Sequence, residues 1–377
     1  MRSRLLAILV LALAQSPAAA QQANHADRAT RTALVARIDS LALDYLLTSP
    51  AASMAVAIVR GSDTLVMRGY GYADVTSQRL AGPSSIYEIG SITKQFTSSA
   101  IMRLVEQGKI SLDDDMSKYL PSFPLQGHRV TIRQLLNHTS GIHSYTSEQA
   151  WRPHWAEDLS PDSIVGFVTR DTFDFAPGAR WSYNNTGYVL LGMIVEKVTG
   201  VPYARYLDEQ FFNPLGLQYT MYCPAPNARD TTFAIGYSPR SGQLVPADYL
   251  SMTHPFSAGA LCSSVRDYLV WQRALHGGRI VSAKSYALMT TPDTLNDGKR
   301  LTYGFGLGVG DVGGHHMITH GGGINGYTTA QAYFPADSLS VIAFTNTDGS
   351  SPDFTALNMA RAVLGLPLAT RQRGQRR

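Results

Sequence analysis

The sequence has few cysteines and a modest share of charged residues. Cys223 and Cys262 are its two cysteines, and charged residues make up 16% of the 377 positions, against 44% hydrophobic residues. This balance is typical of a globular protein with ample apolar material for a core, and it excludes disordered and fibrous classes. Neither cysteine has a nearby base in the sequence, so we expect a structural pair. The pair is one disulfide or two separate thiols, and an oxidising compartment favours the disulfide.

No hydrophobic run is long enough to cross a bilayer. The apolar stretch Leu5–Ala14 falls short of the roughly 20 residues that a membrane-spanning helix needs. It follows a basic start and precedes small residues, which is the layout of a cleavable secretory signal over residues 1–20. We therefore expect a mature chain that begins near Gln21, has no transmembrane segment and is secreted or periplasmic.

The body of the chain also lacks an excess of charge of one sign. Of 32 basic residues, two lie in residues 1–20 and four in the tail 371–377, which leaves 26 basic against 28 acidic residues in 21–370. The body is thus about neutral, and nucleic acid is not an expected partner. We expect the basic tail to be a solvated terminus, the alternative being a weak tether to anionic lipid or wall polymer.

The histidines lack the spacing of a metal site. His138 and His143 lie close in sequence, as do His315 and His316, but neither pair has the helical i, i+4 spacing or an acidic companion. We expect no metal and no cofactor. His138 is expected to be a structural hydrogen-bonding residue.

Apolar periodicity predicts strands at both ends of the chain and helices between them. Helices are expected at Thr32–Leu47 and Asp353–Leu364. The expected strands are Met54–Val59, Thr64–Tyr72, Tyr303–Val309, His316–His320, Thr328–Phe334 and Leu339–Thr345. The simplest packing is an α+β fold in which one antiparallel sheet, from roughly 30–85 and 276–368, is flanked by the N- and C-terminal helices. A mainly helical subdomain, roughly 86–275, is inserted, and the active site lies in the groove between the two parts.

Ser91 and Lys94 lie three positions apart at the start of a helix that is expected to end before Gly108. On a helix such residues share one face. A serine hydroxyl becomes a nucleophile when a base removes its proton, and a buried lysine can be that base because desolvation lowers its pKa. The backbone N–H of Ser91 can also stabilise the oxyanion that forms. An S-x-x-K string is weak evidence alone, so its flanks decide the matter.

The flanks resemble a known family. Five segments match it in the correct order along most of the mature chain: Tyr87–Thr97, Ile132–Ile142, Pro177-Gly178, Trp181–Tyr188 and Pro214–Leu217. They resemble the superfamily of class C β-lactamases, D-Ala-D-Ala carboxypeptidases and family VIII esterases. The resemblance implies a β-lactamase/transpeptidase-like fold over residues 21–370 and a serine hydrolase that forms an acyl-enzyme.

The second motif of that superfamily, Y-x-N, matches Tyr183-Asn184-Asn185. The resemblance implies that Tyr183 shares the base and leaving-group acid roles with Lys94, and that Asn185 binds Lys94 and a substrate amide. We expect the Lys94 ammonium to favour the phenolate and thereby to lower the pKa of Tyr183 from its ordinary value near 10.

The third motif departs from the usual K-T-G, because the chain has His320-Gly321-Gly322-Gly323. By resemblance, the Gly323 N–H is the second oxyanion donor, and Gly322 and Gly323 let a substrate lie against the strand edge. His320 is expected to line the pocket and adjust its charge. Histidine in place of lysine removes a permanent cation, which disfavours β-lactams and free C-terminal D-Ala and favours neutral esters or amides.

The sequence thus predicts an exported serine hydrolase whose substrate is a small-molecule or peptidoglycan-derived ester or amide. Esterases and D-Ala carboxypeptidases or D-amino acid peptidases share the same catalytic set, and slow deacylation would give a penicillin-binding protein. A non-catalytic penicillin-binding sensor or scaffold with the same fold is the alternative from another class. The residues carry no signal for an oligomeric state.

Overall fold

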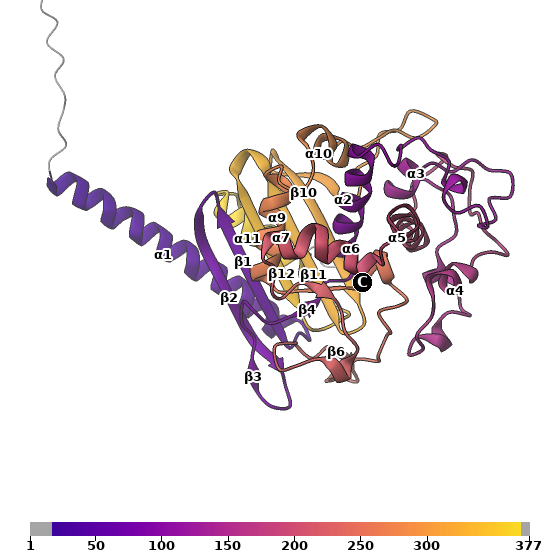
Figure 1. Ribbon diagram of the computed structural model, residues 1–377. Helices are drawn as coiled ribbons and strands as arrows, with labels where there is room; N and C mark the ends of the chain where they lie inside the picture. The colour runs from indigo at the N-terminus through magenta and orange to yellow at the C-terminus, as the bar shows by residue number, and fades with distance from the viewer. Residues whose placement is uncertain (1–16, 371–377) are drawn as a thin grey trace, which may run out of the picture.

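One antiparallel sheet joins the two ends of the chain. The computed structural model describes residues 17–370, with side chains from Arg28 onward. Its largest sheet has seven strands in the order β3-β2-β1-β12-β11-β10-β9 (Figure 1). The strands are β1 (Ser53–Arg60), β2 (Asp63–Asp74), β3 (Arg79–Leu80), β9 (Gly308–Val312), β10 (His315–Ile324), β11 (Tyr327–Phe334) and β12 (Leu339–Thr345). The predicted α+β fold with an antiparallel sheet is confirmed.

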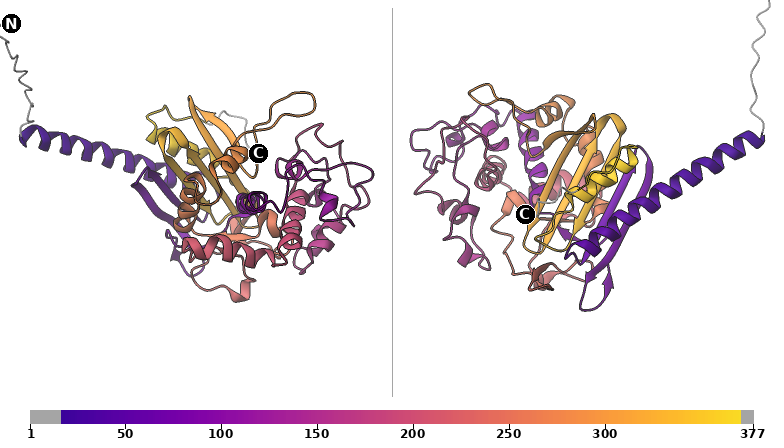
Figure 2. Two further views of the ribbon diagram at one scale, coloured as in Figure 1. Left: turned by 45° about the horizontal axis from the view of Figure 1, so that its top comes forward. Right: turned by 180° about the vertical axis from the view of Figure 1, so that it is seen from behind.

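The central strand β1 explains why the sheet is covered on both faces. Met54, Val56 and Ile58 belong to one buried cluster, and the residues between them belong to the other, as the two-residue period of a strand requires. The first cluster also contains side chains of α1 (Pro17–Thr48) and α11 (Asp353–Val363). Both helices therefore lie on the same face of the sheet, which Figure 2 shows from behind.

The other face of the sheet carries the mainly helical part of the chain. Its principal helices are α2 (Thr93–Glu106), α3 (Ile132–Leu136), α4 (Pro161–Gly166), α5 (Asn185–Thr199), α6 (Tyr203–Leu207), α7 (Asn213–Leu215), α8 (Phe256–Gly259), α9 (Val265–His276) and α10 (Ala283–Thr290). This part also holds two small sheets, β4 (Tyr87–Glu88), β8 (Leu261–Ser263) and β5 (Met221–Tyr222) in one, and β6 (Tyr237–Arg240) and β7 (Gln243–Pro246) in the other. Helix α9 packs directly on β1 and β12, so the inserted part and the sheet share one core.

One strand lies later in the sequence than its apolar pattern predicts. The expected strand Tyr303–Val309 is wrong over Tyr303–Leu307, because β9 begins at Gly308. Gly306 has a φ of +68°, and a Cβ there would lie 2.6 Å from the Lys94 carbonyl oxygen. The chain must therefore turn at Gly306 against the start of α2, which interrupts the extended run.

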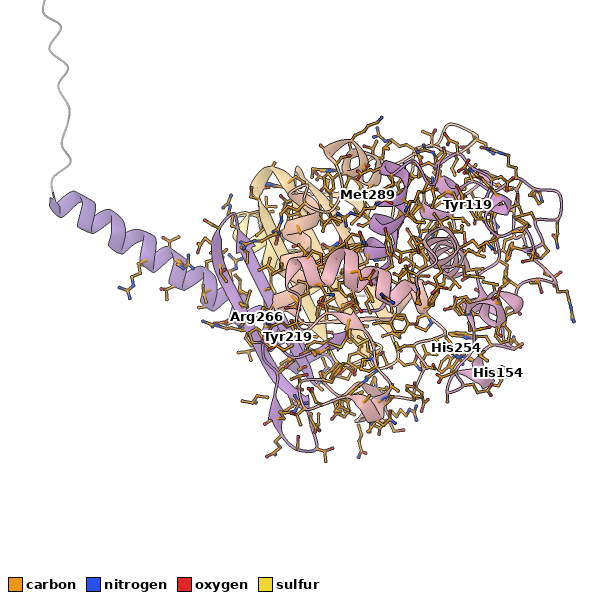
Figure 3. All side chains as sticks on the ribbon, in the orientation of Figure 1. Tyr119, His154, Tyr219, His254, Arg266 and Met289 are labelled. Carbon is orange, nitrogen blue, oxygen red and sulfur yellow. A yellow bond between two sulfur atoms is a disulfide. The ribbon has the colours of Figure 1, made fainter. Side chains whose placement is uncertain are left out.

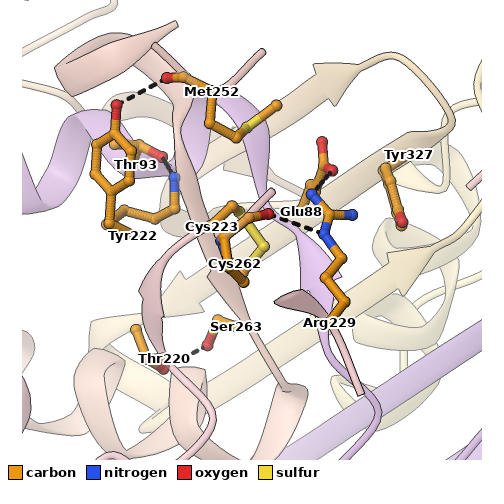
Figure 4. Close-up of a disulfide and its surroundings, with 12 residues drawn as sticks. Glu88, Thr93, Thr220, Tyr222, Cys223, Arg229, Met252, Cys262, Ser263 and Tyr327 are labelled. Atoms are coloured by element: carbon orange, nitrogen blue, oxygen red, sulfur yellow. Dashed lines mark hydrogen bonds and ion pairs between the residues drawn. A yellow bond between two sulfur atoms is a disulfide. The ribbon is translucent and has the colours of Figure 1, made fainter. Parts of the chain in front are cut away.

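Cys223 and Cys262 form a disulfide with an S–S distance of 2.02 Å (Figure 4). Cys262 lies in β8, which pairs with β4 just before Ser91, whereas Cys223 follows β5. The disulfide thus links β8 to the segment that follows β5, in the small sheet beside the serine.

Residues 1–16 of the predicted signal 1–20 and the basic tail 371–377 lie outside the described residues, whereas residues 17–20 begin α1. Across residues 17–370, no helix combines the length and the apolar character that crossing a membrane requires.

Candidate active site

Ser91 lies in a short 3₁₀ turn, Gly90–Ile92, that leads into α2. Strand β10 packs closely on this turn. A Cβ at Gly322 would lie 2.1 Å from the Ile89 carbonyl oxygen, and one at Gly90 would lie 3.0 Å from the Gly323 nitrogen. Only residues without a side chain allow this approach. The sequence therefore places the Gly323 backbone next to the serine turn, with Gly323 itself exposed.

The edge of β10 is open at this position. Strand β9 pairs with β10 from His315 to Thr319 and goes no further, while β11 pairs with its other side up to Ile324. The segment from His320 to Ile324 therefore has one strand partner instead of two.

Lys94 lies inside the protein with no exposed surface. Its Nζ is 3.1 Å from Ser91 Oγ, 2.9 Å from Asn185 Oδ1 and 2.8 Å from the Ala258 carbonyl oxygen. Burial lowers the pKa of Lys94 well below its ordinary value. The neutral amine is therefore the form that this environment favours.

A neutral amine has two N–H donors and one lone pair. Asn185 Oδ1 and the Ala258 carbonyl can only accept hydrogen bonds, so they take the two N–H groups. The lone pair is then left for the hydroxyl hydrogen of Ser91. This arrangement is the one that a general base needs. The role of Ala258 leaves no trace in the sequence, because it uses a backbone oxygen.

Tyr183 lies beside this pair, with Lys94 Nζ 4.8 Å from the centre of its ring. The expected lowering of the Tyr183 pKa is wrong. Burial raises that pKa above its ordinary value, because it disfavours the charged phenolate. A desolvated, neutral Lys94 supplies no positive charge to offset this effect. Tyr183 is thus a neutral phenol, which can donate a proton.

Asn185 is the first residue of α5, and the residues around it hold it in place. Asn184 caps the helix by accepting the Gly187 N–H at 2.6 Å. His138 is buried, and its Nδ1 accepts the Asn184 N–H at 3.1 Å, while its ring lies 4.4 Å from that of Tyr183. His138 therefore supports the Y-x-N segment through hydrogen bonding and packing.

His320 does not occupy the position that the sequence predicts. It is buried, its Nε2 is 2.8 Å from Tyr303 Oη, and its Nδ1 is 2.6 Å from the Gly321 carbonyl oxygen. Nδ1 therefore donates and Nε2 accepts from Tyr303. Burial lowers the pKa of His320 to about 4, so the ring is neutral at neutral pH. Its ring centre is 6.3 Å from that of Tyr183, and it is not among the residues that line the cavity described next.

A cavity of about 130 Å³, hereafter the first cavity, opens at Ser91. It is lined by Gly90, Ser91, Tyr145, Thr146, Trp151, Asn185, Leu250, Pro255, Ala258, Gly259, Gly323, Ile324 and Asn325. Trp151 forms one wall, and its indole N–H donates at 2.7 Å to Nδ1 of His254, which is labelled in Figure 3. Sequence reasoning missed Trp151 and Thr146, because they lie in a loop that has no motif.

The two glycines of β10 give a matched test of the close packing. Gly322→Ala is expected to lower the free energy of unfolding by about 1–3 kcal/mol, because its Cβ would overlap the Ile89 carbonyl. Gly323→Ala should change it by less than about 0.5 kcal/mol, since a Cβ there meets no atom within 4 Å. Urea unfolding measures both. Equal losses from the two substitutions would contradict this packing.

The pH dependence of turnover should follow Lys94. The rate needs its neutral amine, so kcat/KM should fall as the pH drops through the lowered pKa of Lys94 and stay level above it. Tyr183 should add no alkaline limb near neutral pH, because burial raises its pKa. A pH–rate profile with a neutral ester measures this. Tyr183→Phe should slow the reaction but leave the acid limb where it is; a shifted limb would assign the ionisation to Tyr183 instead.

Comparison with known proteins agrees with this geometry. The family model described as Beta-lactamase matches residues 43–366. Penicillin-binding protein 4* of Bacillus subtilis is 31% identical over 310 residues, which cover 78% of this chain and 68% of that protein. A D-aminopeptidase of Brucella canis is 28% identical over 327 residues, which cover 85% of this chain and 61% of that protein. The chain thus spans somewhat under two thirds of the length of that D-aminopeptidase.

Solved structures show the same fold. The octameric penicillin-binding protein homologue from Pyrococcus abyssi has a TM-score of 0.79 and 30% identity, covering 88% of this chain and 78% of that one. A D-stereospecific amidohydrolase from Streptomyces has a TM-score of 0.73 and 28% identity, covering 90% and 99%. The expected β-lactamase/transpeptidase-like fold is therefore confirmed. Because the family model covers most of the chain and the relatives match along the same region, the chain belongs to the beta-lactamase family and is a serine hydrolase of that family.

Proposed function

We propose that the chain is an exported hydrolase that cleaves neutral esters or amides through an acyl-enzyme at Ser91. Lys94 Nζ takes the Ser91 proton while Oγ attacks the carbonyl carbon. The backbone N–H groups of Ser91 and Gly323 stabilise the oxyanion. Tyr183 gives its hydroxyl proton to the leaving group and regains one from Lys94, so the bond to the leaving group breaks with no net change in charge. Water then attacks the ester by the reverse route.

One observation carries the proposal. The two acceptors around Lys94, Asn185 Oδ1 and the Ala258 carbonyl, leave its lone pair directed at the Ser91 hydroxyl. A lysine with a purely structural role would be stable as an ammonium with three acceptors, but complete burial disfavours that form.

The neutral state of His320 supports the preference for uncharged substrates. A lysine at this position could bind a carboxylate as a permanent cation, whereas His320 is uncharged and already bonded to Tyr303 and Gly321. The relatives include a D-aminopeptidase and a D-stereospecific amidohydrolase. Amides of D-amino acids are therefore candidate substrates beside simple esters.

Two observations support export. Residues 1–20 have the composition of a cleavable secretory signal. Cys223 and Cys262 form a disulfide, a bond that persists mainly in oxidising compartments.

The purified protein should be mixed separately with a fluorescent penicillin, p-nitrophenyl butyrate and D-alanine p-nitroanilide, with intact mass and released product followed in each case. Turnover of the ester or the anilide with little penicillin adduct is the expected result. A persistent penicillin adduct would indicate a penicillin-binding protein with slow deacylation. Neither adduct nor turnover with any of the three would contradict the proposal and favour a non-catalytic scaffold.

A further inference from the structure

A second cavity of about 240 Å³ lies next to the first cavity. Leu250 and Asn325 line both, so the two spaces meet at these side chains. Asn325 follows the end of β10, and its side-chain amide donates to the Asp248 carbonyl oxygen at 3.0 Å. This hydrogen bond holds the loop that contains Leu250 against the turn between β10 and β11. The second cavity is thus a fixed continuation of the space at Ser91.

The chemistry at Ser91 decides which part of a substrate points toward the second cavity. The leaving group must lie beside Tyr183, which supplies its proton, and Tyr183 lies near His320. The carbonyl carbon lies near Gly323. The order along β10 is therefore leaving group, then reacting carbonyl, and the acyl part continues past Ile324 to Asn325. The second cavity begins at that point.

Several apolar side chains line the second cavity. Phe233, Ile235 and Tyr249 provide apolar surface, and Ile235 and Tyr249 are 40% and 37% exposed. Exposed apolar side chains that converge on a cavity are typical of a binding site.

The positive charge in the lining is already neutralised. Arg229 donates to Glu88 at 2.7 Å and to the Pro224 carbonyl at 3.0 Å, as Figure 4 shows for the Glu88 pair. Asp230 and Asp248 also line the cavity, and Asp248 is paired with Arg240 at 2.6 Å. Arg229 is the one basic side chain among the lining residues and is already paired, whereas Asp230 adds a negative charge. A distal carboxylate would be repelled, whereas an apolar group would be accepted.

We propose that the second cavity binds the distal part of the acyl group, and that the enzyme prefers N-acylated substrates whose distal end is apolar and uncharged. This inference rests on the proposed function. Among the candidate substrates, those with an N-acyl group should therefore be preferred over D-amino acid amides with a free amino group, because the latter would end within the first cavity.

Three p-nitrophenyl esters with one leaving group test it, namely those of N-acetylglycine, N-(4-phenylbutanoyl)glycine and N-succinylglycine. The wild type should hydrolyse the phenylbutanoyl ester with a kcat/KM about tenfold above that of the acetyl ester. It should hydrolyse the succinyl ester no faster than the acetyl ester. Ile235→Trp fills the second cavity from an exposed position, so it should abolish the tenfold preference. Leu47→Trp, at an 86% exposed position on α1, should keep both the preference and the acetyl ester rate of the wild type.

Equal rates for the acetyl and phenylbutanoyl esters in the wild type would overturn the assignment. A preference that survives Ile235→Trp would do the same, as would a succinyl ester that is hydrolysed faster than the phenylbutanoyl ester. Turnover of none of the three esters would overturn the proposed function and this inference together, and that outcome differs from active hydrolysis without a preference.

Discussion

Ser91→Ala is expected to reduce turnover of a p-nitrophenyl ester by at least about 10⁴-fold and to prevent any covalent adduct. The substitution removes the oxygen that would become the acyl ester, and Lys94 then has no proton to accept. Intact mass after incubation with the ester, together with release of p-nitrophenol, measures both effects. The fold should persist, because the neighbouring turn is fixed by Gly322 and Gly323 of β10 rather than by the serine side chain.

Ser99→Ala is the matched control on the same helix. Its buried hydroxyl donates to the Gln95 carbonyl oxygen within α2, away from Lys94. This variant should label and turn over like the wild type. If Ser91→Ala retained a covalent adduct while unfolding at the wild-type temperature, another residue would be the nucleophile.

Lys94→Met should lower kcat/KM by about 10³-fold, because it removes the base while keeping a buried side chain of similar length. The same steady-state assay measures it. Lys109→Met, at an exposed lysine just after α2, should leave the rate unchanged and controls for loss of a positive charge. A fall of less than tenfold in Lys94→Met would show that proton transfer does not depend on this amine.

The same variant should also change how stability depends on pH. The folded wild type holds Lys94 neutral, since burial lowers its pKa, while the unfolded chain binds a proton there up to a pH near 10.5. The unfolded state thus carries one more proton in this range, so stability rises with pH. Lys94→Met should lose this rise of the unfolding free energy with pH, which is about 1.4 kcal/mol per pH unit. Urea unfolding of the wild type and of Lys94→Met, at several pH values between the two pKa values, measures this. Equal slopes of the unfolding free energy against pH in the two proteins would show that the amine is charged in the folded state.

Local patterns were sufficient to predict the sheet and the central motif. The apolar run from Met54 to Val59, which ends before the turn residues Gly61-Ser62-Asp63, predicts a strand, and the structure has β1 at Ser53–Arg60. The run is apolar throughout because the two faces of β1 are buried in different clusters. The spacing of Ser91 and Lys94 predicts a shared face because helix geometry fixes it, and their side chains lie 3.1 Å apart. Such features depend on neighbours in sequence.

Features that depend on burial by residues distant in sequence could not be predicted in the same way. The direction of the Tyr183 pKa shift follows from burial beside His138 and His320, which lie far from it in sequence. His320 was expected in the pocket because of its position in the motif. It is instead buried, and its ring is hydrogen-bonded to Tyr303. The second cavity forms where Leu250 meets the end of β10, and no local pattern marks such a meeting.

The disulfide has a consequence for how the protein is prepared. Cys223 precedes Pro224, whose carbonyl holds Arg229 at the wall of the second cavity, and Cys262 lies in β8. Material made in a reducing bacterial cytosol would lack this cross-link, whereas material from an oxidising host would have it. Two preparations with equal specific activity on a short ester could therefore rank long acyl substrates differently. The thiol content of each batch should be measured before their substrate profiles are compared.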